Sequence, residues 1–431
     1  MRLLVEPTVG PLSHELLIPN SKYHAHRALI LASLAHGYSR IVGLTHAKHV
    51  TFTLRLLRDL GTSIEIDGDT FIVRGGSYRP TRQVLSAGSS GSTLYFMVGL
   101  CALADRPVTL FAQRYFMRRP VQPLLECLQQ LGIHTSSNGG CPPIEVSVGR
   151  PAGGHVRIPG MLSQWLSGLL LVAPFARQQT TIEVEGTLNE RPYVDLTVAM
   201  MRQFGLAVGV SQDGRRYVIP PNQEPKPTTV QLPPDISAAA FGLAIAALHP
   251  ADVFLRGLQD LDGQPTPHPE AAFLDVMREI GLPMRYDPQR GGMQVRHEGV
   301  RLRAMHVDCR ETPDMLPILT TLATFAEGET VIENIEHVRL KESDRVSAML
   351  QLNGMGGRLR VQGSRLVIQG VERLSGRDLS SYNDHRVLMS LAVAATRAQG
   401  SSRLTYPHAY RISYPDFLEA MKGIGARMEC I

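Results

Sequence analysis

Three short stretches of the sequence place hydroxyl, amide and cationic side chains immediately before an apolar segment. They are residues 20–27 with Lys22, Tyr23 and Arg27, residues 88–93 with Gly91, and residues 163–164, which are Ser163 and Gln164. Unpaired backbone N–H groups at the start of a helix attract anions, and a nearby cation strengthens that attraction. One such helix start alone is an ordinary cap. Three of them together predict helix N-termini that converge on a small anionic ligand.

Arginine residues occur in three further polar stretches. The sequence RYFMRRP contains Arg118 and Arg119, RLKESDR contains Arg339, Lys341, Glu342 and Arg345, and YNDHR contains Asp384, His385 and Arg386. A guanidinium group binds carboxylate and phosphate oxygens through paired hydrogen bonds. Since Arg119, Arg345 and Arg386 each precede a segment that reads as a buried helix, we expect them to contact the ligand. We expect Arg118 and Arg339 to form salt bridges on the surface.

The charge balance and the length of the apolar runs exclude several classes of protein. There are 44 Lys and Arg residues against 39 Asp and Glu residues, and no dense basic block accompanies a row of aromatic residues, so nucleic acid is not an expected partner. No apolar run is long enough to cross a membrane, and Glu6, Pro7 and Pro11 interrupt the N-terminal stretch. We therefore expect a soluble, cytoplasmic, monomeric protein that acts on small molecules.

Cysteine and histidine give no sign of a metal site. The five cysteines form no CxxC pair and are odd in number, which argues against a disulfide framework and against a zinc site. His24 and His26 are two positions apart at an expected helix start, so they cannot face one ion from a helix. We expect reduced cysteines, no metal and no cofactor.

Six copies of one pattern run along the chain at intervals near seventy residues. In each copy an amphipathic stretch ends in a bulky residue followed by glycine, at Gly61, Gly132, Gly205, Gly281, Gly356 and Gly425. Glycine is the usual residue that ends a helix in the left-handed conformation. The residues that follow, for example SIEIDGDTFIVRG, alternate like two strands of a hairpin with Asp-Gly at the bend. The repeat predicts an α/β fold of six similar units.

The length and the proline content divide these copies into two groups. A chain of 431 residues exceeds the roughly 250–300 residues that one core usually serves. A proline-rich segment, residues 225–234, separates the third copy from the fourth. We expect domain I to comprise residues 1–14 and 235–431, domain II to comprise residues 20–231, and hinges to lie near residues 15–19 and 232–235.

Together these stretches resemble the 5-enolpyruvylshikimate-3-phosphate synthase family from about Leu17 to Phe417. The sequence keeps the family order of motifs, which here read NSK with ALILASLAHG, GSSGST, RRP, SQ, RPY, TPDMLP, RLKESDR, YNDHR and YPDF. No single motif is decisive, but their order over nearly the whole chain is specific. The resemblance implies the two-domain enolpyruvyl transferase fold, with six βαβαββ repeats, three per domain, around an interdomain cleft.

The family's chemistry is the transfer of the enolpyruvyl (carboxyvinyl) group of phosphoenolpyruvate to a hydroxyl of an acceptor, with release of phosphate. The resemblance implies that the donor contacts are Lys22, Gly91, Arg119, Arg345 and Arg386. It assigns the acid, base and charge-stabilising roles to Lys22, Asp314, Lys341 and Glu342, with Asp314 taking the proton of the acceptor hydroxyl. It implies acceptor contacts at Tyr23, Arg27, Ser163, Gln164, Tyr193, Asp314, His337 and Lys341.

Several positions depart from the family pattern, mostly on the acceptor side. They are Tyr23 and Leu162 in place of serines, Glu190 in place of a serine near the acceptor phosphate, His337 in place of an asparagine, Tyr95 in place of an arginine, and Ile412 in place of a lysine. Each lost charge-assisted bond to a phosphate costs about 1–3 kcal/mol. We therefore expect an enolpyruvyl transferase whose acceptor differs from shikimate 3-phosphate, with the ordinary shikimate-pathway enzyme as the alternative.

Three other interpretations stay open. The sister enzyme that acts on UDP-N-acetylglucosamine usually carries a cysteine in its catalytic loop, but the corresponding FAQRYFMRRP has none. RNA 3′-phosphate cyclase shares the folding unit, but its nucleotide and covalent-histidine signatures are not visible. The scaffold could also catalyse a dehydration or cyclisation without phosphoenolpyruvate, which Ile412 favours and the retained Lys22, Arg119, Arg345 and Arg386 oppose.

Overall fold

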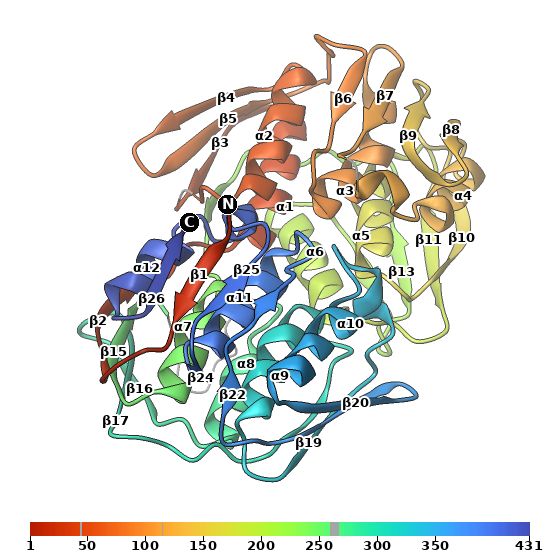
Figure 1. Cartoon of the computed structure of the whole chain (residues 1–431). Helices are drawn as coiled ribbons and strands as arrows, with labels where there is room; N and C mark the ends of the chain where they lie inside the picture. The colour runs from red at the N-terminus through yellow and green to blue at the C-terminus, as the bar shows by residue number, and fades with distance from the viewer. Residues whose placement is uncertain (44, 114, 259–266) are drawn as a thin grey trace. The chain divides into compact units, whose positions relative to one another are not determined.

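The structure is a computed structural model of the chain and describes residues 1–43, 45–113, 115–258 and 267–431 (Figure 1). Contacts divide the chain into two compact units. Unit 1 comprises Met1–Pro19 and Pro234–Ile431, and unit 2 comprises Asn20–Pro233. Each unit contains its own cluster of buried apolar side chains. The expected hinges and the expected cleft concern motion and placement of domains, and they stay predictions.

Unit 2 contains three sheets of four strands that share one topology. Their strand orders are β14-β3-β5-β4, β6-β7-β9-β8 and β10-β11-β13-β12. The first two strands of each sheet are parallel, and the other neighbours are antiparallel. The strands are β3 (Gly37–Val42), β4 (Ser63–Asp67), β5 (Thr70–Gly75), β6 (Val84–Ser86), β7 (Val108–Phe111), β8 (Thr135–Asn138), β9 (Cys141–Val146), β10 (Gly154–Pro159), β11 (Thr180–Glu185), β12 (Gly209–Val210), β13 (Arg216–Ile219) and β14 (Thr229–Gln231).

The helices of unit 2 are of two kinds. The almost entirely buried ones are α1 (Lys22–Leu34), α3 (Gly91–Leu100) and α5 (Ser163–Val172), and the amphipathic ones are α2 (Lys48–Asp59), α4 (Gln122–Gln130) and α6 (Arg191–Gln203). A helix that is apolar on all sides belongs in a core. Gly168 permits the close packing of α5 on α3, because a Cβ there would lie 2.4 Å from the carbonyl oxygen of Tyr95.

Unit 1 repeats the same design with three more four-stranded sheets, ordered β16-β17-β15-β2, β18-β19-β21-β20 and β23-β25-β1-β26. A small sheet pairs β22 with β24. The strands are β1 (Leu3–Glu6), β2 (Leu12–Leu17), β15 (Ala251–Arg256), β16 (Met284–Asp287), β17 (Gly292–His297), β18 (His306–Asp308), β19 (Glu329–Glu333), β20 (Arg358–Gln362), β21 (Arg365–Gln369), β22 (Leu374–Ser375), β23 (Asp378–Leu379), β24 (Ala398–Gln399), β25 (Ser402–Leu404) and β26 (Arg427–Cys430).

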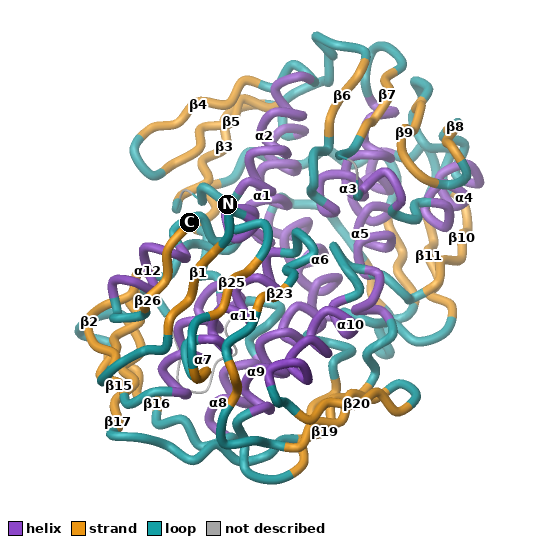
Figure 2. The backbone as a smooth tube through the Cα atoms, viewed as in Figure 1, coloured by secondary structure: helices purple, strands orange, loops and turns teal. Residues whose placement is uncertain are grey.

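Buried and partly exposed helices also alternate along the sequence of unit 1. Figure 2 shows these helices between the strands. The fully buried helices are α7 (Ile236–Leu248), α9 (Leu316–Thr324) and α11 (His385–Ala395). The partly exposed helices are α8 (Ala272–Glu279), α10 (Arg345–Met349) and α12 (Phe417–Gly423). The expected fold of six repeated α/β units, three in each half, is therefore confirmed.

The glycine that ends each amphipathic stretch adopts the predicted backbone conformation. The φ angles run from 79° to 106° at Gly61, Gly132, Gly205, Gly281, Gly356 and Gly425. A residue with a Cβ would be strained at such an angle. The hairpins β4–β5, β12–β13 and β20–β21 then follow, as the alternation of residues predicted.

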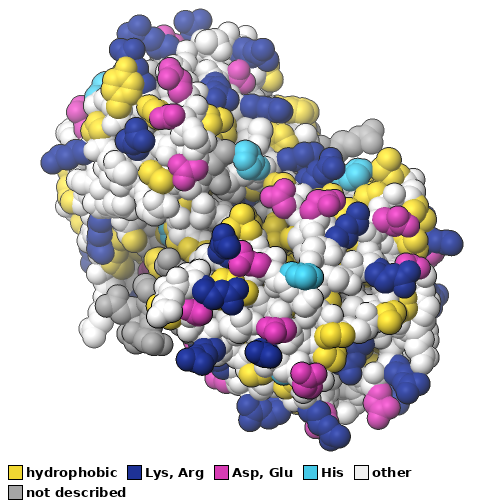
Figure 3. Space-filling view, turned by 90° about the vertical axis from the view of Figure 1, so that its left-hand side faces the viewer, with side chains coloured by type: hydrophobic (Ala, Val, Ile, Leu, Met, Phe, Trp, Pro, Cys, Tyr) yellow, Lys and Arg dark blue, Asp and Glu magenta, His cyan; other side chains and the backbone are white. Residues whose placement is uncertain are grey.

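No helix in the described part of the chain has both the length and the apolar character of a membrane span. On the face shown in Figure 3, cationic and acidic side chains are intermixed. The five cysteines are free thiols, and burial raises the pKa of Cys101 and of Cys127 to about 12.

Candidate active site

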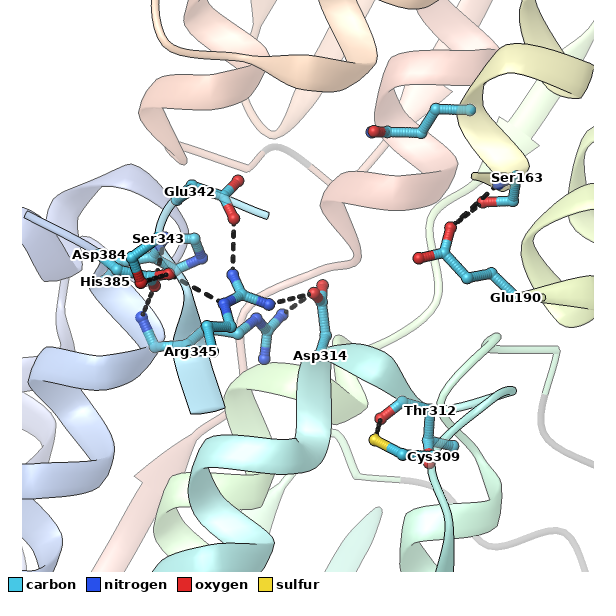
Figure 4. Close-up of polar contacts among 12 residues, drawn as sticks. Ser163, Glu190, Cys309, Thr312, Asp314, Glu342, Ser343, Arg345, Asp384 and His385 are labelled. Atoms are coloured by element: carbon cyan, nitrogen blue, oxygen red, sulfur yellow. Dashed lines mark hydrogen bonds and ion pairs between the residues drawn. The ribbon is translucent and has the colours of Figure 1, made fainter. Parts of the chain in front are cut away.

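Arg345, the first residue of α10, lies at the centre of an ion-pair cluster in unit 1 (Figure 4). Its guanidinium group donates from Nη1 to Asp314 Oδ1 at 2.7 Å, from Nη2 to Glu342 Oε2 at 2.7 Å, and from Nε to Asp384 Oδ2 at 2.9 Å. The Arg345 side chain is 1% exposed. Three carboxylates therefore surround one buried cation.

Burial and the surrounding carboxylates act on Arg345 in opposite directions. Burial by itself lowers the pKa of Arg345, whereas Asp384, Glu342 and Asp314 raise it, and the net pKa lies well above the ordinary value. A buried charge is tolerated when each of its donor edges is paired. Arg345 is therefore a permanent cation whose orientation is set by its three partners.

Arg386 places a second buried guanidinium group beside the first. It is the second residue of α11, and its Nη2 lies 3.1 Å from Asp314 Oδ2, so the Asp314 carboxylate bridges the two arginines. Asp384 caps α11 by accepting from the backbone N–H of Arg386 at 2.9 Å. Its other oxygen accepts from Ser343 as well as from Arg345. Two adjacent guanidinium groups of this kind can bind one multiply charged anion.

Lys341 and His337 lie in the segment that leads to this cluster. His337 begins the short 3-10 helix His337–Leu340 and is buried, and Lys341 follows this helix and is partly exposed. Arg339 donates to Asp344 at 2.6 Å, which confirms the expected salt bridge. Asp344 in turn caps α10 through the N–H of Ser347. Arg339 thus serves the local structure.

Helix α1 of unit 2 begins with Lys22, and three of the predicted site residues meet there. The Nζ of Lys22 lies 3.7 Å from the centroid of the Tyr23 ring. The Tyr23 ring contacts the Tyr193 ring edge to face, with 5.2 Å between centroids. Because Lys22 is buried, its contact with an aromatic face is a favourable place for its charge.

Arg27 joins α1 to α6. It donates from Nε to Thr197 Oγ1 at 2.8 Å, and from Nη1 and Nη2 to the carbonyl oxygens of Tyr23 and Tyr193, each at 3.0 Å. Burial lowers the pKa of Arg27 to about 9, and Tyr193 and Tyr23 partly oppose this shift. All three guanidinium nitrogens thus have partners within unit 2. Arg27 positions the two helices, and a contact with an acceptor would come in addition.

Gly91, the first residue of α3, lies against Arg119 and Gln164. A Cβ at Gly91 would be 3.0 Å from Arg119 Nη1 and 3.2 Å from Gln164 Oε1, so a side chain there would displace both groups. Arg119 follows the 3-10 helix Phe116–Arg118 and is buried. Gln164 also donates to Ser92 at 3.3 Å. A guanidinium group, an amide and a helix N-terminus are thereby gathered, which suits an anion.

Ser163 begins α5, and the side chain of Glu190 reaches it (Figure 4). Glu190 directly precedes α6, has a φ of 59° and is buried. Its Oε2 accepts from the N–H of Ser163 at 3.1 Å and also from the Ser163 hydroxyl. The start of α5 is therefore already occupied by an anion of the chain itself.

Known proteins match this chain over nearly its whole length. The family described as EPSP synthase (3-phosphoshikimate 1-carboxyvinyltransferase) matches residues 7–421. The chain belongs to the EPSP synthase family. Two relatives named 3-phosphoshikimate 1-carboxyvinyltransferase are 31% identical over 436 residues (Methanocaldococcus jannaschii, 100% of both chains) and 34% identical over 419 residues (Methanococcoides burtonii, 96% of both). A solved EPSP synthase from Acinetobacter baumannii has the same fold, with a TM-score of 0.81, 23% identity, and coverage of 100% of this chain and 99% of that one.

Membership of the EPSP synthase family confirms the resemblance and the transferase class expected from the sequence. The predicted site residues form groups within each unit: Asp314, Glu342, Arg345 and Arg386 in unit 1, and Lys22, Tyr23 and Tyr193 with Gly91, Arg119 and Gln164 in unit 2. The individual binding and catalytic roles of these residues stay predictions.

Asp384 and Ser343 were not among the predicted site residues. Both contact the Arg345 cluster, Asp384 directly and Ser343 through the Asp384 carboxylate. A signal was present for Asp384, because aspartate directly before an apolar stretch is a common N-cap. No local signal marks Ser343, since its partner lies in a distant segment of the chain.

Proposed function

We propose that this chain is a 3-phosphoshikimate 1-carboxyvinyltransferase, which transfers the carboxyvinyl group of phosphoenolpyruvate to a hydroxyl of shikimate 3-phosphate and releases phosphate. The observation that carries the proposal is the pair of buried guanidinium groups, Arg345 and Arg386, bridged by Asp314. Relatives that match 96% or more of the chain carry the name of this activity, which supports the choice of reaction.

Binding of the donor requires several fixed cations, because phosphoenolpyruvate carries both a carboxylate and a phosphate. Arg345 and Arg386 are two such cations in unit 1, and the resemblance to the family also assigns donor contacts to Lys22 and Arg119. The Asp314 carboxylate contacts one nitrogen of each guanidinium group. A donor oxygen that displaced it from Arg345 or Arg386 would link donor binding to release of Asp314.

The reaction transfers a proton at three points, and at one carbon it forms one C–O bond and breaks another. A proton reaches the methylene carbon of the donor, and the acceptor oxygen bonds to the neighbouring enol carbon as it loses its own proton. The tetrahedral intermediate then loses phosphate and a proton. A carboxylate paired with two guanidinium groups is a weak base, so release from one of them makes Asp314 a better acceptor for the hydroxyl proton. Lys22, Lys341 and Glu342 provide the remaining acid, base and charge-stabilising groups.

The acceptor is the point on which the sequence analysis and the relatives differ. The departures from the family pattern led to the expectation of a different acceptor, whereas the full-length relatives favour the ordinary one. One observation favours a second candidate, transfer to a hydroxylated acceptor without a phosphate. The Glu190 carboxylate already accepts hydrogen bonds from the N–H and hydroxyl of Ser163, which a phosphate of the acceptor would otherwise bind.

Incubation of the protein with phosphoenolpyruvate and either shikimate 3-phosphate or unphosphorylated shikimate distinguishes these candidates. The proposed function predicts release of inorganic phosphate, and a carboxyvinyl product by mass spectrometry, with shikimate 3-phosphate. Release with the unphosphorylated acceptor alone would support the second candidate. A protein that does not bind phosphoenolpyruvate would overturn both.

A further inference from the structure

A continuous chain of hydrogen bonds runs through the interior of unit 2, from α1 through α2 to the start of α3. His26 Nδ1 lies 2.8 Å from Thr53 Oγ1, and Thr53 Oγ1 lies 2.7 Å from Thr93 Oγ1. Thr93 Oγ1 donates to Ser90 Oγ at 2.8 Å. The four residues are each at most 1% exposed. None of them has a role in the proposed function so far.

The donor-to-acceptor direction of this series of hydrogen bonds is fixed, because each hydroxyl group has only one hydrogen to donate. Thr93 uses its hydrogen toward Ser90, so at the contact with Thr53 it accepts and Thr53 donates. The hydroxyl hydrogen of Thr53 is therefore donated to Thr93 and cannot be donated to His26. The remaining contact needs a donor on the histidine, which is the Nδ1–H of His26.

His26 can supply this hydrogen as a neutral ring. Burial first, and then His49, Arg27 and Lys22, lower the pKa of His26 well below its ordinary value. A neutral imidazole has a single N–H, and the chain of donors places it on Nδ1. Every member of the chain is therefore oriented toward Ser90 at neutral pH.

Ser90 is the end of the chain and has a hydrogen left to donate. Its Oγ accepts from Thr93 Oγ1 and also from the backbone N–H of Thr93 at 3.2 Å, which uses both lone pairs. Within the described ranges no acceptor is found for the Ser90 hydroxyl hydrogen. Leaving a buried donor unsatisfied is costly, so this hydroxyl indicates an acceptor supplied by a ligand.

The surroundings of Ser90 specify the charge of that ligand. Ser90 is the N-cap of the ten-residue helix α3 and directly precedes Gly91. The position of a Cβ on Gly91 is 3.0 Å from Arg119 Nη1 and 3.3 Å from Gln164 Nε2. The Ser90 hydroxyl therefore caps a helix N-terminus whose first residue lies against a buried guanidinium group, which favours an anion.

We propose that Ser90 donates a hydrogen bond to a phosphate oxygen of phosphoenolpyruvate at the start of α3. His26, Thr53 and Thr93 are positioning residues that fix the direction of the Ser90 hydroxyl. Hydrogen bonds in such a buried chain also polarise one another, which strengthens the last donor. This inference rests on the proposed function, because it takes phosphoenolpyruvate as the molecule that binds here.

Calorimetric titration of the full chain with phosphoenolpyruvate tests the proposal. Thr53→Val interrupts the chain but leaves Ser90 in place, and it should weaken binding by about threefold to tenfold. Thr53→Ser restores the hydroxyl and should bind within about twofold of the wild type. Ser90→Asp keeps a good N-cap but replaces the donor with an anion, so it should weaken binding by about a hundredfold or more.

Two measurements separate this role from a contribution to packing. Thr324→Val is the matched control, because it removes a buried threonine hydroxyl that, among the residues the structure describes, bonds only to the carbonyl oxygen of Thr320 within α9 of unit 1. Its affinity for phosphoenolpyruvate should equal that of the wild type. The ¹⁵N shifts of the imidazole, assigned with a His26→Asn variant, should show the Nδ1-protonated tautomer. A proton on Nε2 would overturn the direction of the chain.

The remaining outcomes distinguish this inference from the proposed function. A wild-type protein that does not bind phosphoenolpyruvate contradicts both. A wild type that binds, together with Thr53→Val and Ser90→Asp variants of unchanged affinity, overturns only the role of Ser90. A loss in Thr53→Val that Thr53→Ser does not restore would assign Thr53 to packing, and would also overturn the inference.

Discussion

The carboxylate of Glu190 accepts hydrogen bonds from both the backbone N–H and the hydroxyl of Ser163 at the start of α5. Glu190 is held there by a left-handed backbone conformation, with φ at 59°, which is uncommon for a residue with a Cβ. The N-terminus of a helix stabilises a negative charge. A phosphate that approached the same N–H would therefore compete with a charge that is already bound.

Replacing Glu190 with serine should lower the KM for shikimate 3-phosphate by about tenfold, with little change in kcat, because it removes this internal competitor. Initial rates of phosphate release at varied acceptor concentration measure the effect. Glu65→Gln, on the exposed side of β4, is the control and should change neither constant. A higher KM in Glu190→Ser would show that the carboxylate helps to bind the acceptor, and would favour an acceptor without a phosphate.

Arg119→Ala and Arg386→Ala should each weaken phosphoenolpyruvate binding by at least about tenfold, or roughly 1.4 kcal/mol, because each removes a fixed cation. Trp165 provides a fluorescence signal for the titration, since its Nε1 donates to the carbonyl oxygen of Pro120, next to Arg119. Arg360→Ala, which removes only an exposed ion pair with Glu329, serves as the control. Unchanged affinity in both site variants would contradict the proposed donor contacts.

Asp314→Asn should depress turnover far more than donor binding. Loss of a proton acceptor costs about a hundredfold or more in kcat, whereas the single side-chain oxygen of asparagine can still accept a hydrogen bond from one of the two arginines. Single-turnover rates and a binding titration on the same protein separate the two effects. If donor affinity fell and the chemical step did not, Asp314 would be a positioning residue for the arginines and not the base.

His249 should make the protein less stable in mild acid. Its Nε2 lies 2.9 Å from Thr396 Oγ1, and burial, followed by Arg397, lowers its pKa to about 4 from 6.5. Between these two values the unfolded chain binds more protons than the folded one, so stability falls as the pH falls from 6.5 toward 4. The full difference is about 3 kcal/mol.

Thermal unfolding of the wild type and of His249→Gln between neutral pH and pH 4 measures the contribution of His249 to the pH dependence of stability. The variant should lose less stability on acidification. His26 also has a lowered pKa and titrates in the same direction, but it is present in both proteins, so the difference between their slopes belongs to His249. Parallel slopes would mean that His249 is already protonated, or exposed, in the folded protein.

The repeated architecture could be predicted because its signals are local. A glycine that follows an apolar helix turn and an Asp-Gly bend between alternating residues each depend on a few neighbours. Gly61 and the hairpin β4–β5 show both signals, and the structure has the predicted conformation at each. The same holds for the buried helices α3, α5 and α7, which are apolar on nearly all sides.

The contacts within the site could not be predicted, because they join residues that only the tertiary fold brings together. The contact of Arg27 with an acceptor stays a prediction, whereas its bonds to Thr197, Tyr23 and Tyr193 arise from the packing of α1 on α6. Glu190 was expected near the acceptor phosphate, yet its bonds to Ser163 depend on how α5 and α6 pack. Residue types indicated the chemistry, while distances decide which groups already satisfy one another.

Strand β1 lies between β25 and β26, so one sheet of unit 1 unites residues 3–6 with residues 402–404 and 427–430. The strands of unit 2, in contrast, all lie between residues 37 and 231. During translation unit 2 can therefore assemble while most of unit 1 is still unmade, and β1 must wait on the nascent polypeptide with its edges unpaired. Such an unpaired edge is a site for mispairing until the C-terminal strands have been made.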